Sequence, residues 1–144
     1  MRKICTFTIN GIRFGIDVLK VTSILHNIEI VRVPLAGKAV RGIIQYRGHI
    51  ITVIDLRKKF DLPDWEQGEI PLHAIIKTKK GVFSFLVDSV GEIQEIQQNT
   101  KVEIGKNIQE IDSFYVSHSY KLDDSILLIL DAEKVVEVKS ELSV

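Results

Sequence analysis

The side chains in this sequence that could perform chemistry are not arranged as a catalytic or metal-binding site. No two histidines have the spacing of metal ligands, and none has an acidic neighbour at that spacing. The serines lack the strand-to-helix elbow that exposes a nucleophile, and no glycine-rich loop leads into a helix to hold a phosphate. The side chains considered are His26, His49, His73, His118, Ser23, Ser84, Ser113 and Ser117. We therefore predict no enzymatic activity, no metal and no cofactor.

Arg47 has the clearest capacity to bind a partner. It lies between two apolar runs, and its guanidinium can hold a carboxylate through two parallel hydrogen bonds. The same side chain could instead brace two halves of the molecule internally, and the sequence leaves both interpretations open. Gly42 and Gly48 could permit close approach by a partner. Glycine inside a strand more often marks a bulge or sharp bend, so the structural role is favoured.

Apolar strand residues are the other candidates for a binding surface. Val21, Ile24, Ile43 and Ile50 could line a groove for an amphipathic helix. Most apolar residues in strands are simply core, which is the competing interpretation. Trp65 stands in a polar segment, where we expect it to pack against the fold, although tryptophan is also enriched at interfaces.

Composition excludes several other classes of protein. The chain has 144 residues, of which 45% are hydrophobic and 26% charged, which is unlike a disordered protein. Its 19 basic and 19 acidic residues cancel, so the net charge favours neither nucleic acid nor an anionic membrane. Cys5 is the only cysteine, which excludes an internal disulfide and fits a reducing compartment. With no visible targeting signal or long apolar run, we expect a cytoplasmic protein that does not insert into a membrane.

Period-two alternation and frequent turn residues predict an all-β protein with short helices. Asn10-Gly11 predicts a type I′ hairpin turn. Asp55 and Asp131 each follow a strand and are placed to cap the short helices 56–60 and 132–140. The expected strands are 4–9, 12–16, 21–30, 42–46, 49–54, 72–78, 82–90, 92–97, 113–121 and 125–130.

The order of these elements repeats along the chain. Segments 52–60 and 128–136 both read as strand, capping aspartate and helix, and the hairpin at Asn10-Gly11 has a counterpart at Lys80-Gly81. The repeat predicts two similar five-stranded lobes, each closed into a small barrel that leaves no unpaired edge. We place the lobes at 13–70 and 71–130 of one domain that spans 1–144, with 1–12 and 131–144 packing across them. The segment 61–71 has loop composition and is expected to cross between the halves.

Several motifs resemble those of the CheW family of chemotaxis coupling proteins. In the first half they are Phe14-Gly15-Ile16-Asp17-Val18-Leu19-Lys20-Val21, Pro34, Val40-x-Gly42-Ile43 and Arg47-Gly48-x-Ile50-x-x-Val53-Ile54-Asp55-Leu56-Arg57. In the second half they are Phe85-Leu86-Val87-Asp88-Ser89-Val90 and Leu127-Leu128-Ile129-Leu130-Asp131-Ala132-Glu133-Lys134-Val135. The resemblance spans nearly the whole chain.

The resemblance implies two intertwined five-stranded SH3-like barrels and a scaffold without enzymatic activity. Such a protein joins the histidine kinase CheA to the cytoplasmic tips of chemoreceptors. One surface is expected to meet the regulatory domain of the kinase, and the cleft between lobes to receive a receptor helix. The residues expected at the kinase or receptor surface are Val21, Ser23, Ile24, Gly42, Ile43, Arg47 and Gly48.

The sequence departs from the family pattern at three places, one of which is the absence of the usual glycine around Val116-Ser117-His118. Ser23 occupies a position where the family usually has a glutamate, and Gln45-Tyr46 replaces the usual Asn-Leu before Arg47-Gly48. In the family the arginine lies near that acid, so Arg47 needs another acceptor here.

Two alternatives to a chemotaxis adaptor remain at this point. The departures at Ser23 and Gln45-Tyr46 suggest the same fold as scaffold of a different CheA-type pathway, such as one that controls type IV pili. A small-barrel nucleic-acid binder is the other alternative, because fold does not fix function. The zero net charge and the low aromatic content argue against nucleic acid.

Overall fold

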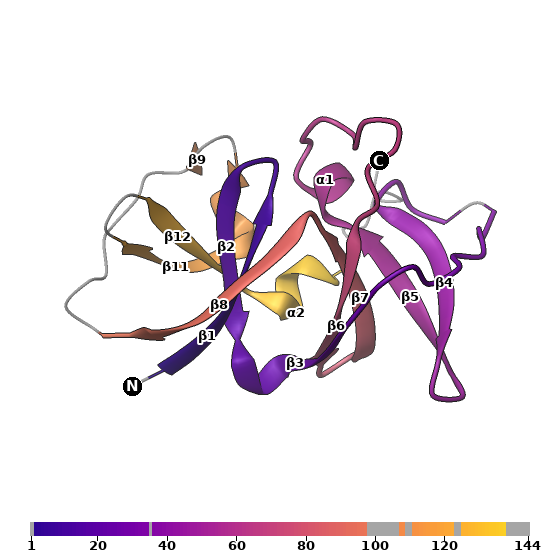
Figure 1. Cartoon of the computed structure of the whole chain (residues 1–144), viewed down its shortest axis with the longest axis horizontal. Coiled ribbons are helices and arrows are strands. Elements are labelled where there is room, and N and C mark those ends of the chain that lie inside the picture. Colours follow the sequence, from indigo (N-terminus) through magenta and orange to yellow (C-terminus); the bar gives the residue numbers. More distant parts are fainter. Residues whose placement is uncertain (1, 35, 98–106, 109–110, 123–124, 138–144) are drawn as a thin grey trace.

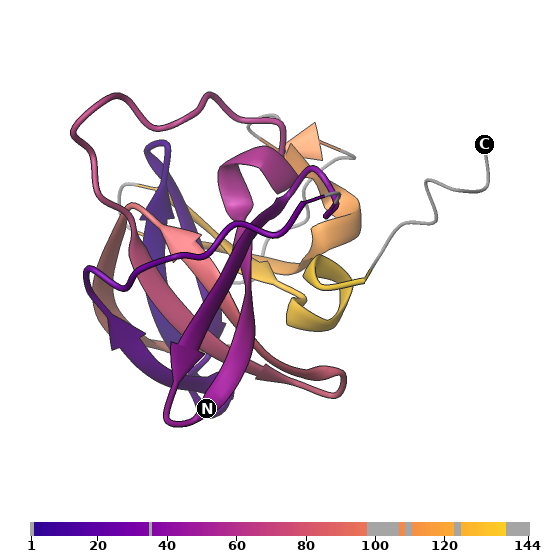
Figure 2. The same cartoon turned by 90° about the vertical axis from the view of Figure 1, so that its right-hand side faces the viewer.

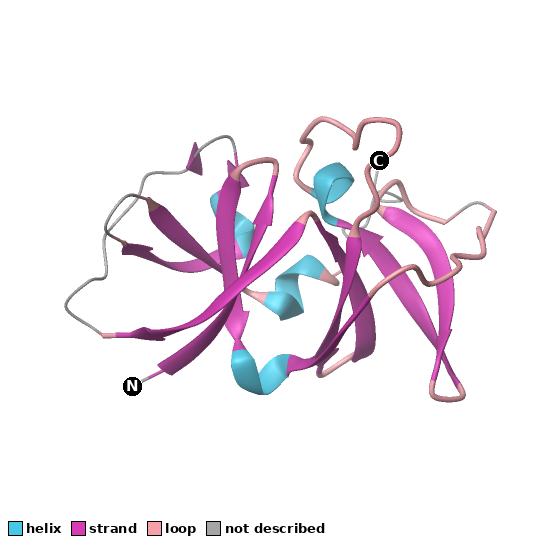
Figure 3. Cartoon of the chain, viewed as in Figure 1, coloured by secondary structure: helices cyan, strands magenta, loops and turns pink. Residues whose placement is uncertain are grey.

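The computed structural model describes residues 2–34, 36–97, 107–108, 111–122 and 125–137. It consists mainly of strands (Figure 3). The strands are β1 (Arg2–Ile9), β2 (Ile12–Asp17), β3 (Val21–Leu25), β4 (Val40–Tyr46), β5 (His49–Asp55), β6 (Leu72–Thr78), β7 (Gly81–Val87), β8 (Ser89–Ile96), β9 (Asn107–Ile108), β10 (Ile111–Asp112), β11 (Val116–Lys121) and β12 (Ile126–Leu130). The helices are α1 (Leu56–Lys59), α2 (Ala132–Val135) and two 3-10 turns, η1 (Val18–Lys20) and η3 (Ser113–Tyr115).

The strands form two five-stranded sheets and a two-stranded ribbon of β9 and β10. Sheet A has the order β11-β12-β2-β1-β8, and sheet B has the order β3-β6-β7-β5-β4. The two sheets lie side by side (Figure 1). The mainly β fold with two five-stranded lobes is thus confirmed. Within the described residues the edge strands of each sheet are not paired as a ladder, so the lobes are open barrels rather than the fully closed ones expected.

The stretch that forms sheet B is inserted between strands of sheet A. Sheet B is built from one continuous stretch, β3 to β7, whereas sheet A combines β1 and β2 with β8, β11 and β12 from the second half. The parallel pair of β2 with β12 joins the two parts of sheet A, and a second parallel pair, β5 with β7, lies within sheet B. The division expected at 13–70 and 71–130 therefore differs from the observed sheets. The sequence repeat showed the order of the elements but not their partners.

Two hairpin turns have the backbone that their sequences require. Asn10 and Gly11 have φ of 52° and 77°, as the predicted type I′ turn demands. Arg47 and Gly48 have φ of 50° and 79° in the turn between β4 and β5. The third strand is shorter than expected, since β3 ends at Leu25 and not at residue 30.

Both short helices begin at the aspartates predicted to cap them. The Asp55 carboxylate accepts a hydrogen bond from the Lys58 amide, and that of Asp131 accepts from the amides of Glu133 and Lys134. Helix α2 ends at Val135, well before residue 140, and the last part of the predicted helix lies outside the described residues. In the described part of the chain, no helix has the length and apolar character to span a bilayer.

The main core lies between the two sheets and is closed by both helices, with α2 between the sheets in Figure 1. A row of aromatic rings runs through it: Phe14 stacks on Phe7 and Phe60, and Phe60 contacts Tyr115. Because residues of sheet A, sheet B and α1 share this cluster, the halves form one hydrophobic unit. Cys5 is buried as predicted, and burial raises the pKa of its thiol.

Asp88 ties the segment between α1 and β6 to the rest of the fold. That segment arches over sheet B (Figure 2) and carries Trp65. The carboxylate of Asp88 accepts from Trp65 Nε1 at 2.6 Å, from Arg57 Nη2 at 2.6 Å and from the Asn10 amide at 2.8 Å. Trp65 also packs against a second core cluster inside sheet B. The prediction that Trp65 packs against the fold is confirmed.

Candidate functional site

Arg47 lies at the tip of the β4–β5 hairpin and is exposed. Its guanidinium carbon lies 5.1 Å from the centroid of the Tyr46 ring, which is a cation–π distance. No ion pair of Arg47 is found among the described residues. This placement supports the interpretation of Arg47 as a partner-facing side chain. It does not support an internal brace, because a side chain at an exposed tip cannot hold the lobes together.

Ser23 and Tyr46 form a pair that the sequence did not predict. The Ser23 Oγ and the Tyr46 Oη lie 2.7 Å apart, within hydrogen-bond distance. β3 and β4 are the two edges of sheet B, so this bond joins strands at opposite ends of the sheet order. The two departures from the family pattern are therefore coupled. The Tyr46 hydroxyl is hydrogen-bonded to Ser23, and the Tyr46 ring makes a cation–π contact with Arg47.

A groove of about 390 Å³ lies beside this hairpin, and we call it the β4–β5 groove. Ile50 is 67% exposed and Val82 is 40% exposed, so apolar surface is available at its mouth. Among the residues that line the groove, Arg47 is the only lysine or arginine. The lining residues are Thr22, Tyr46, Arg47, His49, Ile50, Ile51 and Val82. An apolar surface beside one cation suits a protein segment with apolar side chains and a nearby acid.

Four other predicted residues do not line the groove. Val21 and Ile24 are half-buried and pack against the main core, and Ile43 pairs with Val31 in an isolated bridge. Gly42 has a φ of 149°, and a Cβ there would overlap the carbonyl oxygen of Val31. Register shifts between Val40 and Gly42, so this glycine marks a bulge, as the structural interpretation held.

The structure therefore brings together only part of the predicted set. Arg47 and Ile50 line the groove, and Ser23 reaches it through Tyr46. The other lining residues were not predicted as part of a binding surface: Thr22, Tyr46, His49, Ile51 and Val82. Val82 directly follows the turn glycine of the next hairpin, and an apolar residue at an exposed strand start was the only available signal.

Comparison with known proteins agrees with this architecture. The family model described as "CheW-like domain" matches residues 3–140. The chain is 27% identical to the chemotaxis protein CheW of Bacillus subtilis, over 98% of this chain and 90% of that protein. It is 24% identical to the chemotaxis protein CheW of Klebsiella aerogenes, over 90% of this chain and 78% of that protein.

A solved structure has the same fold. The crystal structure of the scaffolding protein TtCheW from Thermoanaerobacter tengcongensis superposes with a TM-score of 0.86 and 27% identity, covering 97% of this chain and 95% of the other. The family model, the curated relatives and the solved structure agree over almost the whole sequence. This chain belongs to the family of CheW-like domain proteins.

Proposed function

We propose that this chain is a chemotaxis adaptor that couples the cytoplasmic tips of chemoreceptors to the histidine kinase CheA. Curated relatives that match over most of its length are named chemotaxis protein CheW, and a structural relative is named a scaffolding protein. These names favour chemotaxis over both alternatives, the pilus-type pathway and the nucleic-acid binder. The protein would act in the cytoplasm, where the receptor tips and the kinase lie.

The observation that carries the proposal is the exposed Ile50 beside Arg47 at the β4–β5 groove. An apolar anchor next to a guanidinium is typical of the centre of a protein interface. A standard interface buries about 800 Å² on each partner, which the groove and its surroundings would supply only in part. The groove is therefore the proposed centre of a larger contact with the kinase regulatory domain or the receptor tip.

Coupling needs no chemistry on the adaptor. If the adaptor binds kinase and receptor together more tightly in the active arrangement, a change in receptor state shifts that equilibrium. Holding both partners on one small protein also raises their effective concentration for each other. The adaptor's contribution is a binding free energy that differs between two arrangements of its partners.

The test is isothermal titration of the full chain against the CheA regulatory domain, repeated with a receptor-tip fragment present. We expect saturable binding to at least one partner and tighter binding in the presence of the second. Ile50→Thr should weaken binding at least tenfold. Ile93→Thr is the matched control, because Ile93 is 57% exposed on β8 of sheet A, outside the groove.

Two results would overturn the proposal. Failure of the folded parent protein to bind either partner would reject the coupling function. Equal affinities for Ile50→Thr, Ile93→Thr and the parent protein would leave coupling intact but reject the groove as its contact. Circular dichroism of both variants establishes that they are folded.

A further inference from the structure

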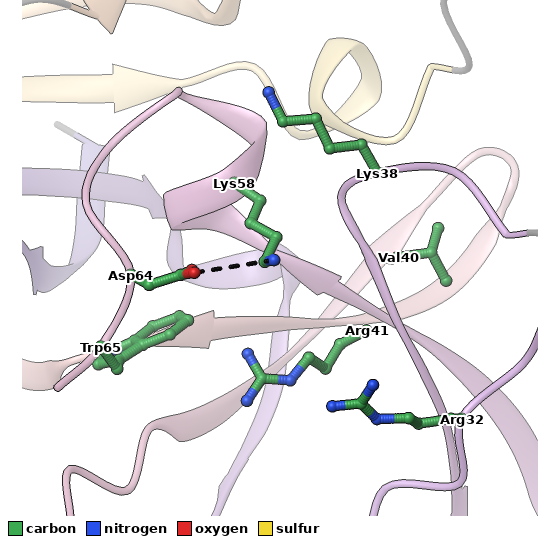
Figure 4. A pocket seen from close by; sticks show the side chains of 7 residues that line it. All are labelled: Arg32, Lys38, Val40, Arg41, Lys58, Asp64 and Trp65. Carbon is green, nitrogen blue, oxygen red and sulfur yellow. Dashed lines mark ion pairs between the residues drawn. The ribbon is translucent and has the colours of Figure 1, made fainter. Parts of the chain in front are cut away.

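A second pocket, of about 310 Å³, is dominated by basic side chains. It is formed by the segment before β4, the start of β4, helix α1 and the segment that carries Trp65 (Figure 4). Its lining contains four basic residues, one acid and two apolar residues. They are Arg32, Lys38, Arg41 and Lys58, then Asp64, then Val40 and Trp65. We propose that this basic pocket binds the carboxylates of a glutamate-rich segment of a protein partner.

Arg41 is held in place for this role. One of its guanidinium nitrogens donates to Asp55 at 3.0 Å, and the Asp55 side chain is completely buried. The Arg41 side chain itself remains 37% exposed, so part of its fork faces solvent. Its guanidinium carbon lies 6.0 Å from the centroid of the Trp65 ring. A guanidinium fixed on one side is preorganised to take a carboxylate on the other.

Arg32 supplies positive charge that no acid neutralises in the described part of the chain. It is exposed, and no acid pairs with it among the described residues. In Figure 4 its guanidinium points toward the same side of the pocket as that of Arg41. Lys38, by contrast, is paired with Asp61 at 2.6 Å, and its ammonium points away from the other lining groups. Two guanidinium groups thus remain for a ligand.

Lys58 is a third cation that a ligand could use. Its ammonium lies 3.8 Å from Asp64, a loose pair in which both side chains are substantially exposed. Exposed pairs of this kind contribute at most about 1 kcal/mol, so an incoming carboxylate can compete with Asp64. The resulting positive charge is moderate, because Asp55 and Asp64 offset part of it.

The shape and charge of the pocket favour glutamates over phosphate or nucleic acid. Trp65 and Val40 give the pocket apolar surface that the methylene groups of glutamate can cover. The Trp65 ring is fixed by its bond to Asp88 and by the guanidinium of Arg57, whose carbon lies 5.0 Å from the ring centroid. A phosphate track would need a longer series of cations with few acids among them. Two spaced guanidinium groups beside an apolar wall match two carboxylates on one short peptide.

Trp65 is the only tryptophan in the chain, so its fluorescence reports directly on this pocket. We would titrate the full chain with a blocked tetraglutamate peptide and follow Trp65 emission together with the NMR shift of its indole N–H. The expected result is a saturable change that weakens as salt is added. The neutral tetraglutamine peptide should produce none.

The variants assign the binding to the pocket. Arg32→Gln should weaken tetraglutamate binding at least fivefold without unfolding the protein, because Arg32 is exposed and has no ion pair with any described residue. Lys80→Gln is the charge-matched control, since Lys80 is exposed in the β6–β7 turn and does not line the pocket. Equal affinities for Arg32→Gln, Lys80→Gln and the parent protein would overturn the proposal.

Inorganic phosphate is the competing ligand in the same assay. If phosphate binds as tightly as tetraglutamate, the pocket is a general oxyanion site and the acidic-segment proposal is wrong. Equal binding of tetraglutamine would also reject it, as would no binding of tetraglutamate at all. The β4–β5 groove shares no lining residue with this pocket, so the two proposals succeed or fail separately.

Discussion

The Ser23 hydroxyl and the Tyr46 phenol lie 2.7 Å apart and join the two edge strands of sheet B. The resemblance to CheW motifs led us to expect an acid at the first of these positions. Here a neutral hydrogen bond stands there, and the neighbouring arginine lies over the tyrosine ring. Because a serine stands where an acid was expected, the charge of Arg47 is available to a partner.

This bond should be measurable as a coupling between Ser23 and Tyr46. Tyr46→Phe and Ser23→Ala should each lower the free energy of unfolding by about 0.5–1.5 kcal/mol, because each removes a half-buried hydrogen bond. The double variant should lose little more than one single variant. Urea denaturation of all four proteins completes the cycle. Fully additive losses would show that the bond does not exist in solution.

Arg47→Asn separates the stability of the β4–β5 turn from its binding. Arg47 has a φ of 50°, a conformation that asparagine adopts more readily than arginine, and Asn-Gly is the preferred type I′ pair. We expect the variant to gain about 0.5 kcal/mol in stability while its affinity for the kinase or receptor partner falls. Thermal melting and titration measure the two effects. A destabilised variant with unchanged affinity would contradict the assigned role of Arg47.

Gly42→Ala should destabilise the protein by about 1–3 kcal/mol, because the added methyl group overlaps the Val31 carbonyl oxygen and the backbone has a φ of 149°. Gly37→Ala is the control. A Cβ at Gly37 has no neighbour within 4 Å, so that variant should melt near the parent temperature. Similar melting temperatures for the two variants would show that the segment around Val31 yields to the new side chain.

Asp88→Asn should lower the free energy of unfolding by about 3–5 kcal/mol, since it leaves the guanidinium of Arg57 buried without its acid. It should also shift Trp65 emission to longer wavelength, because the weakened attachment to residue 88 lets water reach the indole. Asp61→Asn provides the comparison, because the Asp61–Lys38 pair is exposed and should contribute less than about 1 kcal/mol. A small loss at Asp88 would mean that the segment around Trp65 is held by packing alone.

His73 should make the folded state sensitive to mild acid. It is buried, with its Nδ1 2.8 Å from the Ser84 hydroxyl, and desolvation lowers its pKa from the usual 6.5. The unfolded chain therefore binds a proton that the folded chain resists, so stability falls as the pH drops below about 6.5. The melting temperature of His73→Gln should change less between about pH 7.5 and about pH 5.5 than that of the parent. Parallel curves would assign the acid sensitivity to other groups.

Local signals in the sequence predicted local structure well. The turn at Asn10-Gly11 and the caps at Asp55 and Asp131 depend on backbone preferences within a few residues, and all three occur. Strand partners depend on distant residues. The parallel pairing of β2 with β12 leaves no mark on the periodicity of either strand, so the strand composition of sheet A could not be predicted from the repeat.

The same distinction applies to the candidate site. Arg47 and Ile50 belong to one short motif, and both line the groove. Val82 joins them because β5 and β7 pair in parallel, which no local pattern reports. Val21 and Ile24 come from β3 and pack against the core, because a register shift in β3 turns both toward it.

The insertion of sheet B between the strands of sheet A has a consequence for how the chain folds during synthesis. All strands of sheet B lie in one continuous stretch, so that sheet can assemble soon after its last strand leaves the ribosome. Sheet A cannot, since Arg13 pairs with Leu127 near the other end of the described chain. Until β12 is made, the β2 edge of the β1–β2 hairpin has no partner strand. Bringing β2 and β12 together closes a loop of more than a hundred residues, which slows the final step. Assembly should therefore begin with sheet B in the middle of the sequence, and the pairing of β2 with β12 should form last.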